Sequence, residues 1–187
     1  EIKIELQSEN GQWHPVIFKY KPGDERKRPL LFFPHMPRVD WQIWFEALYY
    51  EKLLSDPFLL SSYQNFLSTM VSKGLKLSNI SIDEFLSVKA KKILKTLPPA
   101  ERNSYLNRLS SSLNSYLGHS YWFAMFLSDL IDKGSTVFHN YKIKDNLDII
   151  KMKVSLSLFT FNNDSKNSNN WWVKKDIEKS AFTIELR

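Results

Sequence analysis

The segment Asp40-Trp41-Gln42-Ile43-Trp44-Phe45-Glu46-Ala47-Leu48 marks the point at which the chain changes from strand-like to helical patterning. Its large apolar residues recur at intervals of three and four, which is the spacing of one face of an α-helix. Asp40 precedes them as the predicted N-cap, because a carboxylate there accepts hydrogen bonds from free amides of the first turn. A helical region is therefore predicted to begin at residue 40.

The two ends of the chain are patterned as β-strands. Ile2, Ile4 and Leu6 alternate with polar residues, and an Asn10-Gly11 turn signal separates them from a second alternation through Val16, Phe18 and Tyr20. A short apolar run over residues 30–33 predicts a buried strand. Residues 150–158 give the cleanest alternation in the sequence, and residues 171–173 and 182–186 predict further strands.

The middle of the chain carries further helix signals. Asp56-Pro57 predicts the N-cap and first residue of a helix that ends near Gly74, and Pro98-Pro99 interrupts a later helical stretch. These signals predict an α+β fold, with antiparallel β-sandwich-like sheets formed by the two chain ends and a large helical insertion in the middle. We expect a single domain over residues 1–187, with a β portion at 1–39 and 137–187 and a helical portion at 40–136.

Composition excludes several classes of function. The chain has 187 residues, no Cys and a formal net charge of +6. Without Cys, disulfides, thiol catalysis and Cys-based zinc sites are excluded. The favoured interpretation of this charge is a solubilising excess, and the alternative is attraction of nucleic acid, an anionic membrane surface or an acidic protein. No nucleic-acid-binding motif accompanies the charge, so we expect no nucleic-acid partner. No apolar run reaches the length of a membrane span, and we expect any membrane anchor to lie upstream of Glu1.

Few residues have a pattern that suits catalysis. The four His show no metal-ligand spacing, and no nucleophile elbow or phosphate-binding loop is present, so we expect no catalytic residue, metal or cofactor. His35 and Asp40 could form a base and its orienting carboxylate. The favoured interpretation is structural, with His35 and Pro37 in a rigid turn and Asp40 fixing the start of the helix.

Aromatic and basic side chains are the candidates for partner binding. Trp41 and Trp44 share a helix face, where a core role is favoured over contact with a partner. Arg38 either pairs locally with Asp40 or offers its guanidinium to a partner carboxylate. In a strand, Trp171 and Trp172 would point to opposite faces, so one of them is the best candidate for an exposed aromatic contact.

Several of these segments, in this order, resemble the lipase maturation factor family. Residues 34–48 closely follow a family motif, with Met36 where Gln is usual and Glu46 where Ala is usual. Weaker similarities lie at residues 18–24, in the 121–130 helix, in the strand up to Phe161 and in the terminal Trp pair. The resemblance covers roughly residues 1–50 and 120–175, and it makes residues 51–119 an enlarged insertion relative to the family.

The resemblance implies a non-enzymatic, extracytoplasmic, soluble C-terminal domain of a membrane-tethered protein. Such a domain would bind a secreted lipase-like client and assist its folding or assembly. It would face the endoplasmic reticulum lumen in a eukaryote, and the periplasm or cell exterior in a bacterium. The alternative is a β-sandwich module that binds a glycan or a lipid headgroup, for which a concave pocket lined by Trp would be the distinguishing feature.

Overall fold

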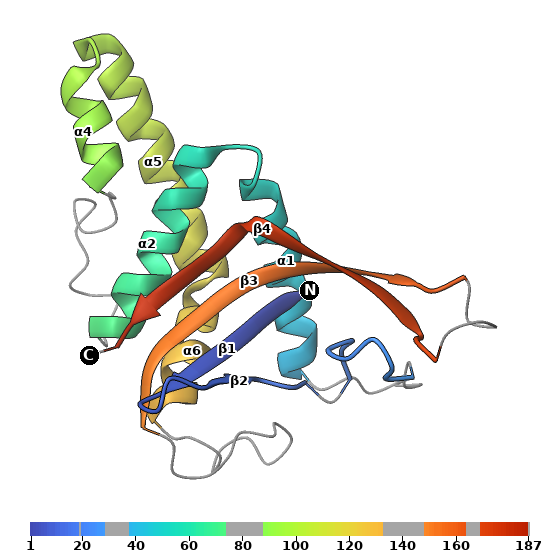
Figure 1. Ribbon diagram of the computed structural model, residues 1–187. Helices are drawn as coiled ribbons and strands as arrows, with labels where there is room; N and C mark the ends of the chain where they lie inside the picture. The colour runs from blue at the N-terminus through green and yellow to red at the C-terminus, as the bar shows by residue number, and fades with distance from the viewer. Residues whose placement is uncertain (19, 29–37, 74–87, 133–147, 164–168, 187) are drawn as a thin grey trace. The chain divides into compact units, whose positions relative to one another are not determined.

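In the computed structural model, the described part of the chain is residues 1–187 without 19, 29–37, 74–87, 133–147, 164–168 and 187. The strands lie at the two chain ends and the helices lie between them in sequence, so the predicted α+β class is confirmed (Figure 1). In chain order the elements are β1 (Ile2–Ser8), β2 (Trp13–Pro15), α1 (Arg38–Leu53), α2 (Pro57–Lys73), α4 (Val88–Thr96), α5 (Pro99–His119), α6 (Tyr121–Asp132), β3 (Ile149–Phe161) and β4 (Trp172–Glu185).

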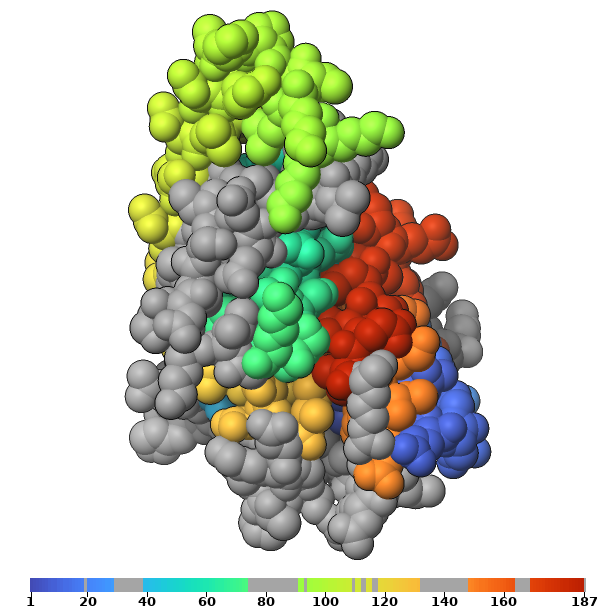
Figure 2. Space-filling view, turned by 90° about the vertical axis from the view of Figure 1, so that its left-hand side faces the viewer, coloured from blue at the N-terminus to red at the C-terminus, as the bar shows by residue number. Residues whose placement is uncertain are grey.

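The described strands form one antiparallel sheet in the order β2-β1-β3-β4. β3 is central: it pairs with β1 from Ile2–Leu156 to Ser8–Ile149, and with β4 along its other edge. Figure 2 shows red β4, orange β3 and blue β1 in this succession at the surface. A second, facing sheet is not among the described elements, and α1 packs on the apolar face of the single sheet instead.

The short hairpin between β1 and β2 follows the predicted turn. Gly11 has a φ of +81°, a conformation that residues with a Cβ rarely adopt. Its amide donates to Ser8 O at 2.8 Å. β2 ends at Pro15, so the prediction that the strand continues through Val16 and Phe18 is wrong. One further backbone hydrogen bond follows the strand, from Val16 N to Ile4 O at 2.9 Å. Val16 and Phe18 are buried without being in a strand, because alternation reports burial and not pairing.

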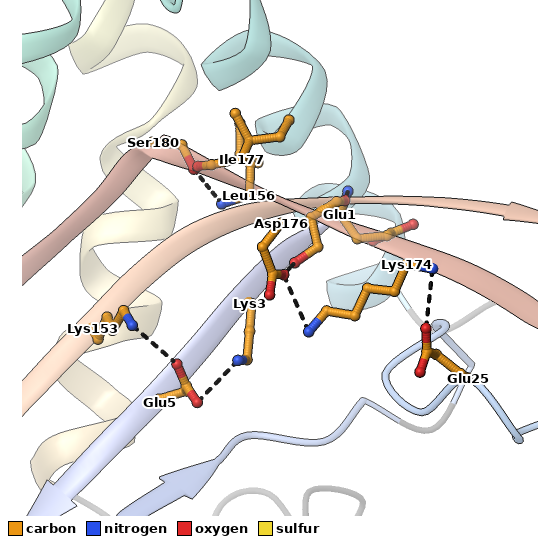
Figure 3. A network of polar contacts seen from close by, with 11 residues as sticks. Glu1, Lys3, Glu5, Glu25, Lys153, Leu156, Lys174, Asp176, Ile177 and Ser180 are labelled. Carbon is orange, nitrogen blue, oxygen red and sulfur yellow. Dashed lines mark hydrogen bonds and ion pairs between the residues drawn. The ribbon is translucent and has the colours of Figure 1, made fainter.

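The sheet has two different faces. Along β1 and β3, one face carries buried aliphatic side chains, and those of Ile4, Leu6, Met152 and Val154 are wholly inaccessible. The opposite face carries charged side chains joined by ion pairs: Lys3 Nζ lies 3.0 Å from Glu5 Oε1, and Lys153 Nζ lies 3.8 Å from Glu5 Oε2 (Figure 3). The period-2 pattern of the sequence therefore sorts core from solvent as expected.

β4 contains a large bulge whose centre is Ser180. Val154 pairs with Phe182 but Leu156 pairs with Ile177, so β4 carries three more residues than β3 across this step. The Ser180 hydroxyl replaces the missing ladder partner, since it accepts from Leu156 N at 2.7 Å and donates to Ile177 O at 2.6 Å (Figure 3). Tyr50 of α1 donates its hydroxyl hydrogen to Ser180 O, which fastens the helix to the bulge.

The chain divides into two compact units. The first comprises Glu1–Glu51 and Leu130–Arg187 and holds the sheet with most of α1; the second comprises Lys52–Asp129 and is helical. In the second unit, Asp56 Oδ1 accepts from Phe58 N at 3.0 Å and Leu59 N at 3.2 Å, as predicted for an N-cap before Pro57. Asp56 also pairs with Arg108 of α5, Oδ2 to Nη2 at 3.1 Å. The expectation of one domain over 1–187 stays a prediction.

The first testable prediction concerns the bulge. Ser180→Ala removes the acceptor of the buried Leu156 amide, and leaving such a group unsatisfied costs about 1–3 kcal/mol of unfolding free energy. The measurement is urea denaturation of the 187-residue chain. Glu178→Ala, an exposed change in the same bulge, is the control, with an expected effect of about 0.5 kcal/mol or less. Equal effects of the two substitutions would contradict a structural role for the Ser180 hydroxyl.

Candidate partner-binding surface

Helix α1 has one face against the sheet and one face exposed. Ile43, Ala47 and Tyr50, at intervals of four and three, are buried. The opposite face exposes Trp41, Trp44, Phe45 and Leu48, each at least 41% accessible. We call these four residues the aromatic ridge. The prediction that Trp41 and Trp44 belong to the core is therefore wrong: the helical period identified the residues that share a face but not which of the two faces is covered.

The three rings of the aromatic ridge support one another. The centroid distances are 5.7 Å for Trp41–Trp44, 5.6 Å for Trp41–Phe45 and 5.6 Å for Trp44–Phe45. Contacts at this range hold large rings in fixed orientations without burying them. The ridge therefore presents a preformed apolar surface, and little further side-chain entropy is lost when a partner covers it.

A shallow hollow extends this surface onto the sheet. Its volume is about 60 Å³, and its lining includes Trp44 and Leu48 of α1 together with Leu158 and Ile177 of the sheet. Leu158 is itself 52% exposed. The aromatic ridge and the far end of β3 thus border the same depression, which could receive one apolar side chain of a partner.

The start of α1 lies over a buried group of charges. Lys21, 4% exposed, pairs with the Glu1 carboxylate, and Lys27 Nζ donates to Phe18 O at 2.9 Å. Asp40 is 1% exposed, and among the described residues no donor reaches its Oδ1. Burial raises the pKa of the Asp40 carboxyl, against the opposing attraction of Lys21 and Lys27. Burial likewise lowers the pKa of Lys21, while Glu1 raises it.

The other predicted site residues are placed as follows. α1 begins at Arg38, so Asp40 lies inside the first turn and the N-cap prediction is wrong. Three predicted groups lie outside the described part of the chain: His35, Pro37 and the side chain of Arg38. The choice between an Arg38–Asp40 pair and a partner carboxylate therefore stays a prediction. Trp171 is 42% exposed, with the Arg28 guanidinium 5.4 Å from its ring centroid. Trp172 is half-buried and donates from Nε1 to Lys27 O at 2.8 Å.

Sequence reasoning missed the exposure of Leu158, Phe161 and Val173, which lie at the far end of the β3–β4 hairpin. Leu158 continues the core alternation of β3, so the period gave no signal that it is exposed. The one usable signal was the change from Ser and Lys to Phe159 and Phe161 at alternate positions of β3.

Two further features bear on catalysis and membrane insertion. Ser8 Oγ lies 3.0 Å from His14 Nε2, but it also donates to Asn10 Oδ1 at 2.6 Å, so this Ser–His pair closes the β1–β2 hairpin. Within the described ranges, His, Asp and Glu form no group of three that could hold a metal ion. Helices in the same ranges are too short or too polar to span a bilayer.

The aromatic ridge lies in the part of the chain that is similar to known proteins. The model of the lipase maturation factor C-terminal domain matches residues 1–94, which include all of α1. Lipase maturation factor 2 of Rattus norvegicus and of Homo sapiens are each 42% identical over 48 residues, 26% of this chain and 7% of each relative. Lipase maturation factor 1 of Bos taurus is 51% identical over 38 residues, 20% of this chain and 7% of that protein. No solved structure matches.

The raised pKa of Asp40 gives a testable pH dependence. The unfolded carboxyl has a pKa of about 3.9, so the folded protein binds this proton more tightly than the unfolded chain does. The Asp40 contribution to stability is therefore complete in acid, below that value, and is lost as the pH rises through the raised folded pKa. Asp40→Asn should flatten this fall in unfolding free energy, measured by urea denaturation across the range from about pH 4 to neutrality.

Asp176→Asn is the matched control. The Ser157 hydroxyl, 2.5 Å from Asp176 Oδ1, and Lys174 lower the pKa of this carboxyl, so its contribution is lost as the pH falls. The two substitutions should change the pH profile in opposite directions. Parallel profiles of Asp40→Asn and the unmodified chain would rule out the assignment of the raised pKa to Asp40.

Proposed function

Since the chain belongs to the lipase maturation factor family, we propose that it binds a secreted lipase-like client and assists its folding or assembly. It acts by binding, not by catalysis. It does so as the extracytoplasmic domain of a membrane-tethered protein, in the endoplasmic reticulum lumen of a eukaryote or outside the cytoplasm of a bacterium. The curated relatives carry the printed name of lipase maturation factors, and the matched stretches span 7% of their length.

The aromatic ridge is the observation that carries this proposal. Trp41, Trp44 and Phe45 are exposed on one helix and lie in the region that the family model matches. A monomeric soluble surface rarely groups large apolar side chains unless they contact something, and interface hot spots are enriched in Trp. Each ring that a client buries fully is worth about 1.5–3 kcal/mol of transfer free energy.

The charged face of the sheet supports the same choice of surface. Glu5 pairs there with both Lys3 and Lys153 (Figure 3). Lys151 Nζ lies 3.0 Å from Glu185 Oε1. A partly folded client exposes apolar segments, which gain little from a surface of paired charges. The ridge face is therefore the one suited to hold such a client.

A glycan- or headgroup-binding module is the less favoured function. A hollow of about 400 Å³ lies beside residues 15–27, and its walls include Phe18, Phe159 and Lys174. Its lining, as far as the chain is described, includes no Trp, whereas a pocket lined by Trp was the feature expected of a glycan site. The exposed Trp residues of α1 lie on a convex helix, which suits a protein partner better than a small ligand.

The test uses the full-length protein expressed with secreted lipases. Trp44→Ala should reduce capture of the lipase, and secretion of active lipase, about tenfold or more, as expected for a hot-spot aromatic residue. Trp13→Ala is the matched control, because Trp13 is similarly exposed, at 40%, and lies on β2 away from the ridge. Thermal unfolding of both variants separates lost binding from lost folding.

The possible outcomes distinguish the two functions. Equal lipase capture by the Trp44→Ala and Trp13→Ala variants would reject the ridge as the client site. Absence of any lipase in the captured material, with unchanged lipase secretion in cells that lack the protein, would reject the client itself. Binding of soluble glycans or headgroups that Trp44→Ala leaves unchanged would favour the alternative module.

A further inference from the structure

The far end of the β3–β4 hairpin carries exposed apolar side chains on both of its faces. We call residues 158–161 and 171–175 the hairpin arm; it projects to the right in Figure 1. Leu158 pairs with Lys175 and Val173 with Thr160, so Leu158 and Val173 share one face, and they are 52% and 50% exposed. Phe161 pairs with Trp172 on the opposite face and is 64% exposed.

The aromatic residues of the hairpin arm are ordered by packing. Phe161 and Trp172 stack at a centroid distance of 4.6 Å. Trp171 and Trp172 both donate their backbone amides to Glu25 O, at 2.8 and 3.1 Å, and Lys174 N donates to the Glu25 carboxylate at 3.2 Å. These bonds hold Glu25 against the backbone of the arm, and the stack with Trp172 orders the exposed Phe161 ring.

Basic residues surround these apolar side chains. In segments 24–28 and 171–176 the cations outnumber the anions by five to three. Arg26, Arg28 and Lys175 are exposed, and the Arg28 guanidinium lies over the Trp171 ring. Of the anions, Asp24 accepts from Arg26 N at 2.9 Å, and Asp176 pairs with Lys174 at 3.1 Å. The cations that remain exposed favour an anionic surface as the partner.

We propose that the hairpin arm inserts into the headgroup layer of a membrane that contains anionic lipid. A protein partner docks against one face of a sheet, whereas a lipid interface surrounds an inserted element and can cover Leu158 and Val173 together with Phe161. Trp and Phe prefer the interfacial layer, and Arg and Lys next to them contact lipid phosphates. The arm adds a second, reversible attachment for a domain whose proposed client surface is the aromatic ridge. Leu158 also borders the hollow beside that ridge, so the substitutions that test the arm are made at Phe161 and Val173.

The test places a single reporter on the hairpin arm. The chain has no Cys, so Thr160→Cys carries the only site for a polarity-sensitive thiol probe, and Thr183→Cys, also exposed on the same hairpin but outside the arm, is the control. With phosphatidylcholine vesicles containing phosphatidylserine, the residue 160 probe should shift to shorter wavelength while the residue 183 probe does not. Pure phosphatidylcholine vesicles should give a smaller shift.

Vesicle flotation of the full chain measures the contribution of each group. Phe161→Ser with Val173→Ser should reduce binding about tenfold, and Arg28→Gln with Lys175→Gln should reduce binding to anionic vesicles about fivefold for each charge removed. Trp13→Ser, a change at an apolar residue that is 40% exposed on β2, should leave binding unchanged. Circular dichroism of each variant checks that it has folded.

Three results would overturn the proposal. The first is flotation that Phe161→Ser and Val173→Ser leave unchanged. The second is a probe shift at residue 183 equal to that at residue 160. The third is a shift at residue 160 that occurs with a purified lipase but not with vesicles, which would make the hairpin arm a protein-binding element.

Discussion

The rest of the first unit depends on the hydrogen bonds of Ser180, which let β4 bend without losing its hold on β3. The bulge would otherwise leave the Leu156 amide buried and unpaired at the middle of the central strand. The same residue accepts the Tyr50 hydroxyl, so the rotation of α1 about its axis is set by the sheet. Because Tyr50 faces inward, Trp41, Trp44 and Phe45 face outward. The exposure of the aromatic ridge and the strand geometry therefore share one cause.

Much of the fold could be predicted because the local signals were strong. Asp56-Pro57, Asn10-Gly11 and the alternation of β3 each have a short-range physical cause. The first two hold in the structure, and the alternation of burial along β3 holds as far as Val154. What could not be predicted is which face of α1 is covered, since a helix with Ile43 and Tyr50 on one side and Trp41 and Trp44 on the other is apolar on both. The exposure of the hairpin arm was missed for a related reason. Alternation shows which residues of a strand share a face, but it does not show at which residue that face leaves the core.

The family match and the sheet divide the chain differently. Residues 1–94 supply β1, β2, α1 and α2, but β3, which pairs with β1 along its long edge, begins at Ile149. The aromatic ridge thus belongs to the matched part, while the surface that orients it comes from the end of the chain. The proposed client surface and its support lie far apart in sequence, so substitutions in β4 can change the orientation of the aromatic ridge through α1.

The pairing of β1 with β3 also determines when the domain can form. Glu1 N and Ser157 O, joined at 2.7 Å, are separated by 156 residues, and the helical unit lies between them. Contacts this distant in sequence form slowly, and during synthesis β1 has only the three-residue β2 as a partner until β3 has left the ribosome. The helices of residues 52–129 make their own contacts and can fold earlier. A protein proposed to assist the folding of others therefore passes through an interval in which its own apolar strand is exposed and needs protection.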